Sequence, residues 1–139
     1  MSPNLPVGLT KDAGWQVGVS RTVPTELQRV WTALTSPEGL AAWLGPGATP
    51  DPQAGAPYEA ADGTSGEMRS WRERDRLRAT RLVPGEDHET TIQVTVSTTP
   101  TGTRIGLHQE RMASQEERSR MRNHWKAVAD ELARVLAAG

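Results

Sequence analysis

The chain has 139 residues, enough for one domain with a buried core but short for two. Hydrophobic residues make up 35% and the mean hydropathy is -0.59, which excludes a membrane-embedded protein, while a net charge of -1 argues against a general attraction to nucleic acid or anionic lipid. The absence of cysteine excludes disulfides, thiol catalysis and the usual zinc sites. Because the start of the sequence lacks a secretory pattern, we expect a soluble, cytoplasmic protein.

The first part of the chain predicts a strand followed by two short helices. Residues 1–14 contain prolines and glycines without periodicity and are expected to be a flexible lead-in. Apolar and polar side chains alternate over residues 15–23, as in a half-buried strand. Residues 25–34 carry apolar side chains at helical spacing, and Ser36 followed by Pro37 is typical of the start of a second helix.

The middle of the chain predicts a meander of antiparallel strands. A loop rich in glycine, proline and alanine, residues 45–57, separates it from the helices. The turns between the strands are short, which requires antiparallel neighbours. The predicted strands cover residues 58–61, 66–71, 74–82, 90–97 and 103–111.

The last segment, residues 114–138, predicts one long amphipathic helix. Its apolar side chains recur at spacings of three and four, with charged side chains between them. Ser114 followed by Glu117 has the spacing of a capping box, which marks a helix start. A strand, two helices, a strand meander and a long helix together predict an α+β fold with the helices on one face of an antiparallel sheet.

Five segments make this order resemble a known family. They read Pro-Thr-Glu-Leu-Gln-Arg-Val-Trp at 24–31, Leu-Thr-Ser-Pro-Glu-Gly-Leu-Ala-Ala-Trp-Leu-Gly at 34–45, Asp-Arg-Leu-Arg-Ala-Thr-Arg at 75–81, Gly-Thr-Arg-Ile-Gly-Leu at 102–107 and His-Trp-Lys-Ala-Val-Ala-Asp-Glu-Leu at 124–132. The chain is similar to the family named for the activator of the heat-shock protein 90 ATPase, within the START-like (SRPBCC, Bet v 1-like) superfamily. The resemblance covers residues 15–139 as a single START-like domain. It implies a helix-grip fold: a curved antiparallel sheet of about six strands wrapped around the C-terminal helix, with a hydrophobic cavity between them that the two short helices close at one end.

Successive side chains of a strand point to opposite faces of the sheet. If Ile92 and Leu107 face the last helix, this alternation predicts which other side chains of the strands face it too. The most apolar of these are expected to fill a core, and the others are candidates for the lining of the cavity that the resemblance implies. The candidate lining residues are Trp43, Tyr58, Met68, Ser70, Ala79, Arg81, Gln109, Met121 and Trp125.

Arg81 is the candidate for contact with an anionic group of a ligand. Family members usually carry Phe and Trp where Ala79 and Arg81 stand, so the resemblance implies a wider and more polar cavity here. An unpaired arginine in a core is very costly, so Arg81 should reach water at a mouth or meet an acidic partner. Arg111 shares the inward parity but lies near a strand end, where solvent exposure is expected.

Two other groups of polar residues are interpreted as solvent-exposed. The basic stripe of Arg72, Arg74, Arg76 and Arg78 is interrupted by acidic residues, which favours a solvated sheet face over a nucleic-acid site. His88, His108 and His124 lack the spacing of metal ligands, and no metal or other cofactor is expected. His88 lies in a predicted turn, and His124, next to Trp125, is expected at the rim of the buried helix face. His108 and Glu110 could act as an acid and a base, but their parity directs them away from the cavity.

The leading hypothesis for the function is therefore the binding of a small, largely hydrophobic molecule between the sheet and the last helix. A cyclase or hydrolase that uses the same cavity is the first alternative, although no nucleophile elbow, phosphate loop or dinucleotide motif is present. The second alternative is a module that interacts with a chaperone, which the name of the family implies. Neither nucleic acid nor membrane is expected as a partner, and the sequence leaves monomer and homodimer open.

Overall fold

The computed structural model describes residues 9–10 and 14–138, and in them seven strands form one antiparallel sheet. Their order across the sheet is β1-β2-β7-β6-β5-β4-β3. Six of the strands correspond to the predicted ones, and the short β1 lies within the part of the chain that was expected to be a lead-in. The strands are β1 (Leu9–Thr10), β2 (Gly14–Val23), β3 (Pro57–Glu59), β4 (Ser65–Arg72), β5 (Arg76–Arg81), β6 (Thr90–Thr99) and β7 (Gly102–Met112).

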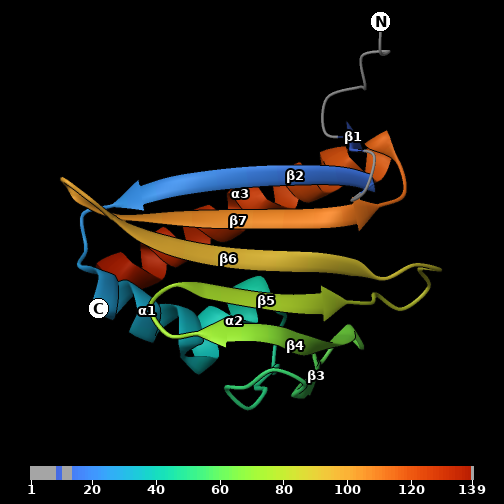
Figure 1. The fold of residues 1–139 in the computed structure, drawn as a ribbon, viewed down its shortest axis with the longest axis horizontal. Helices are drawn as coiled ribbons and strands as arrows, with labels where there is room; N and C mark the ends of the chain where they lie inside the picture. Colours follow the sequence, from blue (N-terminus) through green and yellow to red (C-terminus); the bar gives the residue numbers. More distant parts are fainter. Residues whose placement is uncertain (1–8, 11–13, 139) are drawn as a thin grey trace, which may run out of the picture.

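Three helices lie on the same face of the sheet, behind it in Figure 1. They are α1 (Leu27–Thr35), α2 (Pro37–Trp43) and α3 (Gln115–Ala138). The predicted starts of α2 and α3 are confirmed, because Ser36 Oγ accepts a hydrogen bond from Gly39 N and Ser114 Oγ accepts one from Glu117 N, both at 3.1 Å. The curved antiparallel sheet with a long C-terminal helix and two short helices after the first long strand confirms the predicted helix-grip fold.

The core lies between the sheet and the three helices. Val94 of β6 pairs with Leu107 of β7, and both side chains are almost completely buried, whereas the neighbouring pair Gln93 and His108 faces outward. On α3 the buried positions recur at helical spacing, from Trp125 through Val128 and Leu132 to Leu136. The two periodicities thus bring one apolar face of the sheet against one apolar face of the helix.

The helices α1 and α2 meet at a turn that leaves no room for a side chain. A Cβ atom at Gly39 would lie 1.9 Å from the carbonyl oxygen of Ala33. This close approach brings Trp43 back across α1, where its indole Nε1 donates a hydrogen bond of 2.9 Å to Leu34 O. The short helices therefore form a closed end of the core.

Two strand irregularities change which side chains face outward. The pairing of β4 with β5 shifts between Met68 and Ser70, so Ser70 lies opposite Arg78 on the outer face. The prediction that Ser70 points inward is therefore wrong, because parity cannot be carried through a bulge. Trp71 takes the inner side instead and packs edge-to-face on Trp31 of α1, with ring centroids 6.5 Å apart.

The second irregularity lies where β7 pairs with β2. The register shifts between Trp15 and Val17, and Arg111 on the facing strand has a φ of 68°. Arg111 is exposed, as its place near the strand end predicted. None of the helices in the described residues is both long and apolar enough to cross a membrane.

Candidate ligand-binding cleft

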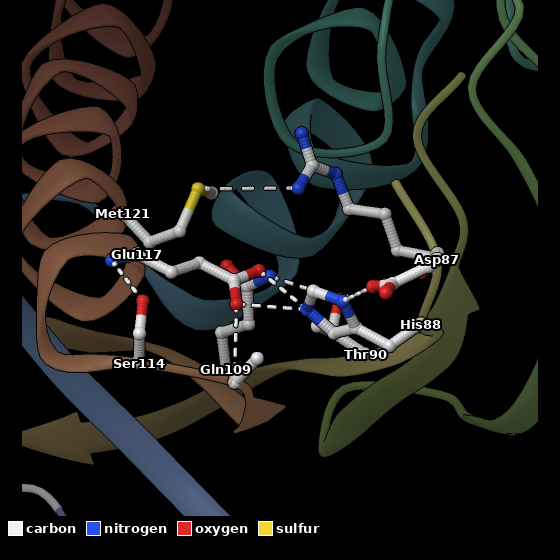
Figure 2. A network of polar contacts seen from close by, with 9 residues as sticks. Asp87, His88, Thr90, Gln109, Ser114, Glu117 and Met121 are labelled. Carbon is white, nitrogen blue, oxygen red and sulfur yellow. Dashed lines mark hydrogen bonds and ion pairs between the residues drawn. The ribbon is translucent and has the colours of Figure 1, made fainter. Parts of the chain in front are cut away.

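A small cleft opens where the end of β5 and the connection to β6 face the first half of α3 (Figure 2). On α3, Glu117, Met121 and Trp125 are spaced four residues apart, so they lie on one side of the helix, and the buried Gln109 of β7 reaches the same region. The residues around the cleft are Arg81, Val83, Glu86, His88, Thr90, Glu117, Arg120 and Met121.

The floor of the cleft is a chain of hydrogen bonds between buried side chains. Trp125 Nε1 donates to Gln109 Oε1 at 2.8 Å, and Gln109 Nε2 donates to Thr90 Oγ1 at 2.9 Å. Gln109 is completely buried, and Trp125 and Thr90 are nearly so. Both ends of the glutamine amide have partners, so this polar group stabilises the fold and is not free to hold a ligand.

One wall of the cleft joins the β5–β6 connection to the start of α3. His88 Nε2 lies 2.8 Å from one carboxylate oxygen of Glu117, and His88 Nδ1 lies 3.0 Å from Asp87 Oδ1 (Figure 2). Glu117 also accepts a hydrogen bond of 2.7 Å from the backbone N–H of Ala113, which fixes its position. The hydrogen bond that the His88 ring donates to Asp87 raises the pKa of His88, burial opposes this, and Glu117 adds to the increase. The same contact lowers the pKa of Asp87.

Arg81 forms the opposite wall and has no carboxylate partner among the described residues. Its Nη1 lies 4.0 Å from Met121 Sδ, which is a weak acceptor, and within the described part of the chain it makes no ion pair. Burial lowers the pKa of Arg81, and the surrounding acidic groups, Tyr58 first and then Asp62, oppose this shift. The guanidinium is thus partly desolvated, and its contact with the weak acceptor Met121 Sδ and the charges of more distant acidic groups compensate this only in part.

The cleft is small compared with the cavity that the resemblance implied. Its volume is about 90 Å³, whereas sites for drug-sized ligands span roughly 300–1,000 Å³. The space between sheet and helix is occupied by side chains, including Met68, Leu77 and Ile92, each completely buried. Only a small chemical group fits into the cleft as it stands.

The structure distributes the predicted lining residues over four environments. Arg81 and Met121 line the cleft, and Gln109 and Trp125 lie directly beneath it. Trp43, Met68 and Ala79 are buried in the core, and Ser70 faces outward.

Tyr58 is also buried and is the middle residue of the edge strand β3. Its hydroxyl donates a hydrogen bond of 2.6 Å to Thr80 O, and burial raises its pKa to about 12. Tyr58 borders an open hollow of about 570 Å³ between β3 and β4.

Sequence reasoning missed the contact between His88 and Glu117. The spacing of Ser114 and Glu117 indicated only a helix cap, and His88 was interpreted as an exposed turn residue. The two side chains are 29 positions apart and meet through the return of α3 across the sheet, so no local pattern could reveal the pair. As for metals, the described residues contain no group of three candidate ligands.

The fold is shared with several solved structures of low sequence identity. Protein MLL2253 from Mesorhizobium loti is 21% identical, with a TM-score of 0.76 over 88% of this chain and 97% of that one. CalU16 from Micromonospora echinospora is 19% identical, with a TM-score of 0.78 over 91% and 80% of the two chains. DynU16, a protein in the dynemicin biosynthetic locus, is 24% identical, with a TM-score of 0.73 over 88% of this chain and 47% of that one.

Comparison at the level of sequence gives the family. No curated protein matches the chain significantly. The profile of the family described as activator of Hsp90 ATPase homolog 1-like protein matches residues 24–137, which include α1, α2, nearly all of α3 and the strands β3 to β7, but neither β1 nor β2. The predicted family is therefore confirmed, and the chain belongs to the activator of Hsp90 ATPase homolog 1-like family.

Proposed function

We propose that this protein binds a small, largely hydrophobic molecule that carries one anionic group, and that Arg81 holds this group inside the cleft. The helix-grip fold is compatible with ligand binding. The observation that carries the proposal is the partly desolvated guanidinium of Arg81, which faces the cleft without a carboxylate partner in the described residues. Removing a charged group from water is costly unless a partner compensates it, and a ligand carboxylate or sulfonate would be such a partner.

The volume of the cleft determines how a ligand would enter. About 90 Å³ accommodates an anionic group, and the apolar part needs more room. Met121 is the side chain that would provide it, because methionine is flexible, adapts to different shapes and here lines the cleft in contact with Arg81. The hydrogen-bonded floor of Thr90, Gln109 and Trp125 would remain in place.

A suitable probe is 8-anilinonaphthalene-1-sulfonate, an aromatic molecule with one sulfonate. We expect saturable binding, seen as increased dye emission, and a shift of the Trp125 indole N–H signal in NMR spectra, since this group lies under the cleft. Arg81→Met should weaken binding by about tenfold or more, because it removes a charge-assisted hydrogen bond. Met121→Ala should strengthen binding by enlarging the cleft.

Arg122→Met is the matched control, because Arg122 is an exposed arginine of α3 and follows the cleft residue Met121 directly in the sequence. It should leave the dye affinity unchanged. Non-saturable binding, or equal losses in Arg81→Met and Arg122→Met, would contradict the proposal.

An enzyme that uses the same cleft is the second candidate, and the His88–Glu117 pair favours it. A histidine oriented by a carboxylate is a common general acid or base, and this one borders the cleft that holds Arg81. Its test is turnover of aromatic or polyketide-like substrates by the purified protein. Activity that disappears in His88→Gln but persists in His108→Gln would support it, and the absence of turnover across the substrate panel would reject it.

A further inference from the structure

The outer face of the sheet, on the side turned away from the helices in Figure 1, contains a hollow lined mainly by arginine. Its volume is about 620 Å³. We call it the arginine hollow. Its lining residues are Arg69, Ser70, Arg72, Arg76, Arg78, Thr80, Glu89, Thr91 and Arg111.

The hollow results from short side chains surrounded by long ones. Thr80 of β5 pairs with Thr91 of β6, and the bulge in β4 places Ser70 beside them on the outer face. After Ser70 and Arg78, the next outward-facing pair along β4 and β5 is Arg72 and Arg76, at the side of the hollow. Serine and threonine thus form the floor, and arginines form the walls.

Positive charge remains after the ion pairs are counted. Arg69 pairs with Glu67 at 2.7 Å, and Arg78 pairs with Glu110. Together with Glu89, the hollow and its partners contain three carboxylates against five arginines. The remaining arginines, Arg72, Arg76 and Arg111, form no ion pair within the described residues. The protein as a whole has a net charge of -1, so this excess is local.

Two of these arginines are held at a cost to the fold. The Nε atom of Arg76 is buried and has no hydrogen-bond partner in the described residues, which is uncommon for a buried donor. Arg111 adopts a left-handed backbone conformation, φ 68°, which costs a residue with a side chain roughly 1–2 kcal/mol. At Arg111 the irregular backbone turns this side chain outward and buries the next one, Met112, in the core. The unpartnered Nε of Arg76 has no such role in packing, and it makes sense if the arginine side chain serves a ligand.

We propose that the arginine hollow binds a small molecule with two adjacent oxyanion groups, of the diphosphate type. Arginine binds phosphate through two parallel N–H···O bonds, and Arg72, Arg76 and Arg111 supply guanidinium groups from β4, β5 and β7. The hydroxyls of Ser70 and Thr91 on the floor are additional donors. This site is on the opposite face of the sheet from the cleft of Arg81 and is independent of it.

The limited extent of the charge favours a small ligand over nucleic acid. Glu67, Glu89 and Glu110 lie within or around the hollow, and they would repel a phosphate backbone that extended beyond it. Specific nucleic-acid interfaces cover on the order of 1,000 Å² or more of a positively charged surface. The binding of two neighbouring phosphate groups requires only the hollow itself.

The test is titration calorimetry of the full chain with inorganic pyrophosphate. We expect saturable binding that weakens with added salt, and a loss of about tenfold or more in Arg76→Gln. Arg72→Gln, an exposed position in the same register pair, should show a similar loss and replaces Arg76→Gln if that variant does not fold. Binding of 8-anilinonaphthalene-1-sulfonate in the cleft should be unchanged in both variants.

Arg104→Gln is the matched control, because Arg104 is exposed on the same sheet face but lines a separate hollow next to β2. It should leave the affinity for pyrophosphate unchanged. The proposal is overturned if pyrophosphate does not bind saturably or if Arg104→Gln weakens it as much as Arg76→Gln does. It is also overturned if a single-stranded oligonucleotide displaces pyrophosphate and itself loses affinity in Arg104→Gln.

Discussion

The two faces of the sheet hold their polar side chains in different ways. On the inner face Gln109 is completely buried, and its amide is bonded at both ends, to Trp125 and to Thr90. On the outer face the Nε atom of Arg76 is buried and has no hydrogen-bond partner in the part of the chain that the structure describes. Polar groups whose bonds are all made within the protein stabilise the fold, whereas a charged group left without a partner costs free energy. The charged groups that could still gain from binding a ligand therefore lie on the outer face and at the edge of the inner face.

Arg81 is the exception on the inner face. It belongs to β5, the strand that also carries Arg76 and Arg78 on its outer face. Unlike Gln109, it faces a cleft, and among the described residues the hydrogen-bond partner of its guanidinium is the sulfur of Met121, a weak acceptor. On the inner face, the hydrogen bonds of the central polar side chain, Gln109, are thus all made within the protein. At the edge, where the cleft opens, the guanidinium of Arg81 has only a weak sulfur contact among the described residues.

Truncation of Trp125 should produce the largest effect on stability. Trp125→Ala removes a buried ring and leaves the oxygen of Gln109 without its donor, so the free energy of unfolding should fall by about 3–5 kcal/mol. Urea denaturation monitored by circular dichroism measures it. Lys126→Ala, at the exposed neighbouring position, should change the value by about 0.5 kcal/mol or less. Similar losses in the two variants would mean that the inner face is not packed as described.

A change at Gln109 tests whether the inner hydrogen bonds matter beyond packing. Gln109→Leu has a similar size but leaves the indole N–H of Trp125 without its acceptor, and we expect a loss of about 1–3 kcal/mol. Gln93→Leu is the control, because Gln93 lies on the outer face of β6 and accepts a bond from Arg78. Its cost should be about 0.5 kcal/mol. Denaturation curves of the two variants would refute the contrast if the loss were the larger one in Gln93→Leu.

Most of the fold, but less of the site, could be predicted from the sequence. The alternation in β6 and the helical spacing in α3 are local patterns, and both faces followed from them correctly at Ile92, Leu107 and Trp125. The prediction for Ser70 was wrong because a single bulge reverses which side chains of β4 face inward. No residue type in β4 indicates where this bulge lies.

The contacts that define the two candidate sites depend on tertiary structure. His88 meets Glu117 only after α3 has packed across the sheet, and the arginine hollow exists only because a bulge lies next to a pair of threonines. The alternating arginines of β5 and the end of β4 were visible in the sequence, but the lack of partners for Arg76 was not. The sequence of one strand predicts on which face of the sheet a charged side chain lies. Whether that charge has a partner depends on side chains from other strands.

Replacing one arginine of the outer face, Arg111, by glycine should make the protein more stable. Arg111→Gly relieves the left-handed backbone conformation, and the free energy of unfolding should rise by about 0.5–1 kcal/mol while pyrophosphate binding weakens. Arg104→Gly, in extended backbone of the same strand, should instead lower it by about 0.5–1 kcal/mol. Thermal denaturation of both variants gives the signs. If Arg111→Gly instead destabilised the protein, the backbone of Arg111 would not be strained, and this strain could no longer support a ligand site in the arginine hollow.

The smallest expected effect concerns the contact between His88 and Glu117, and it depends on pH. The pKa of His88 is raised in the folded protein, first by Asp87 and then by Glu117. The folded protein therefore binds the proton of this ring more tightly than the unfolded chain does. This stabilisation is complete below the ordinary pKa of histidine, about 6.5, and is lost as the pH rises through the higher folded value. The difference in unfolding free energy between wild type and His88→Gln should therefore be larger at about pH 6 than at about pH 9. His108, whose pKa is lowered by burial, contributes with the opposite sign, but it is present in both proteins and cancels in the difference. A difference that stayed constant with pH would show that the bridge from the β5–β6 connection to α3 holds equally well with a neutral ring, and the cleft wall would then not respond to protonation.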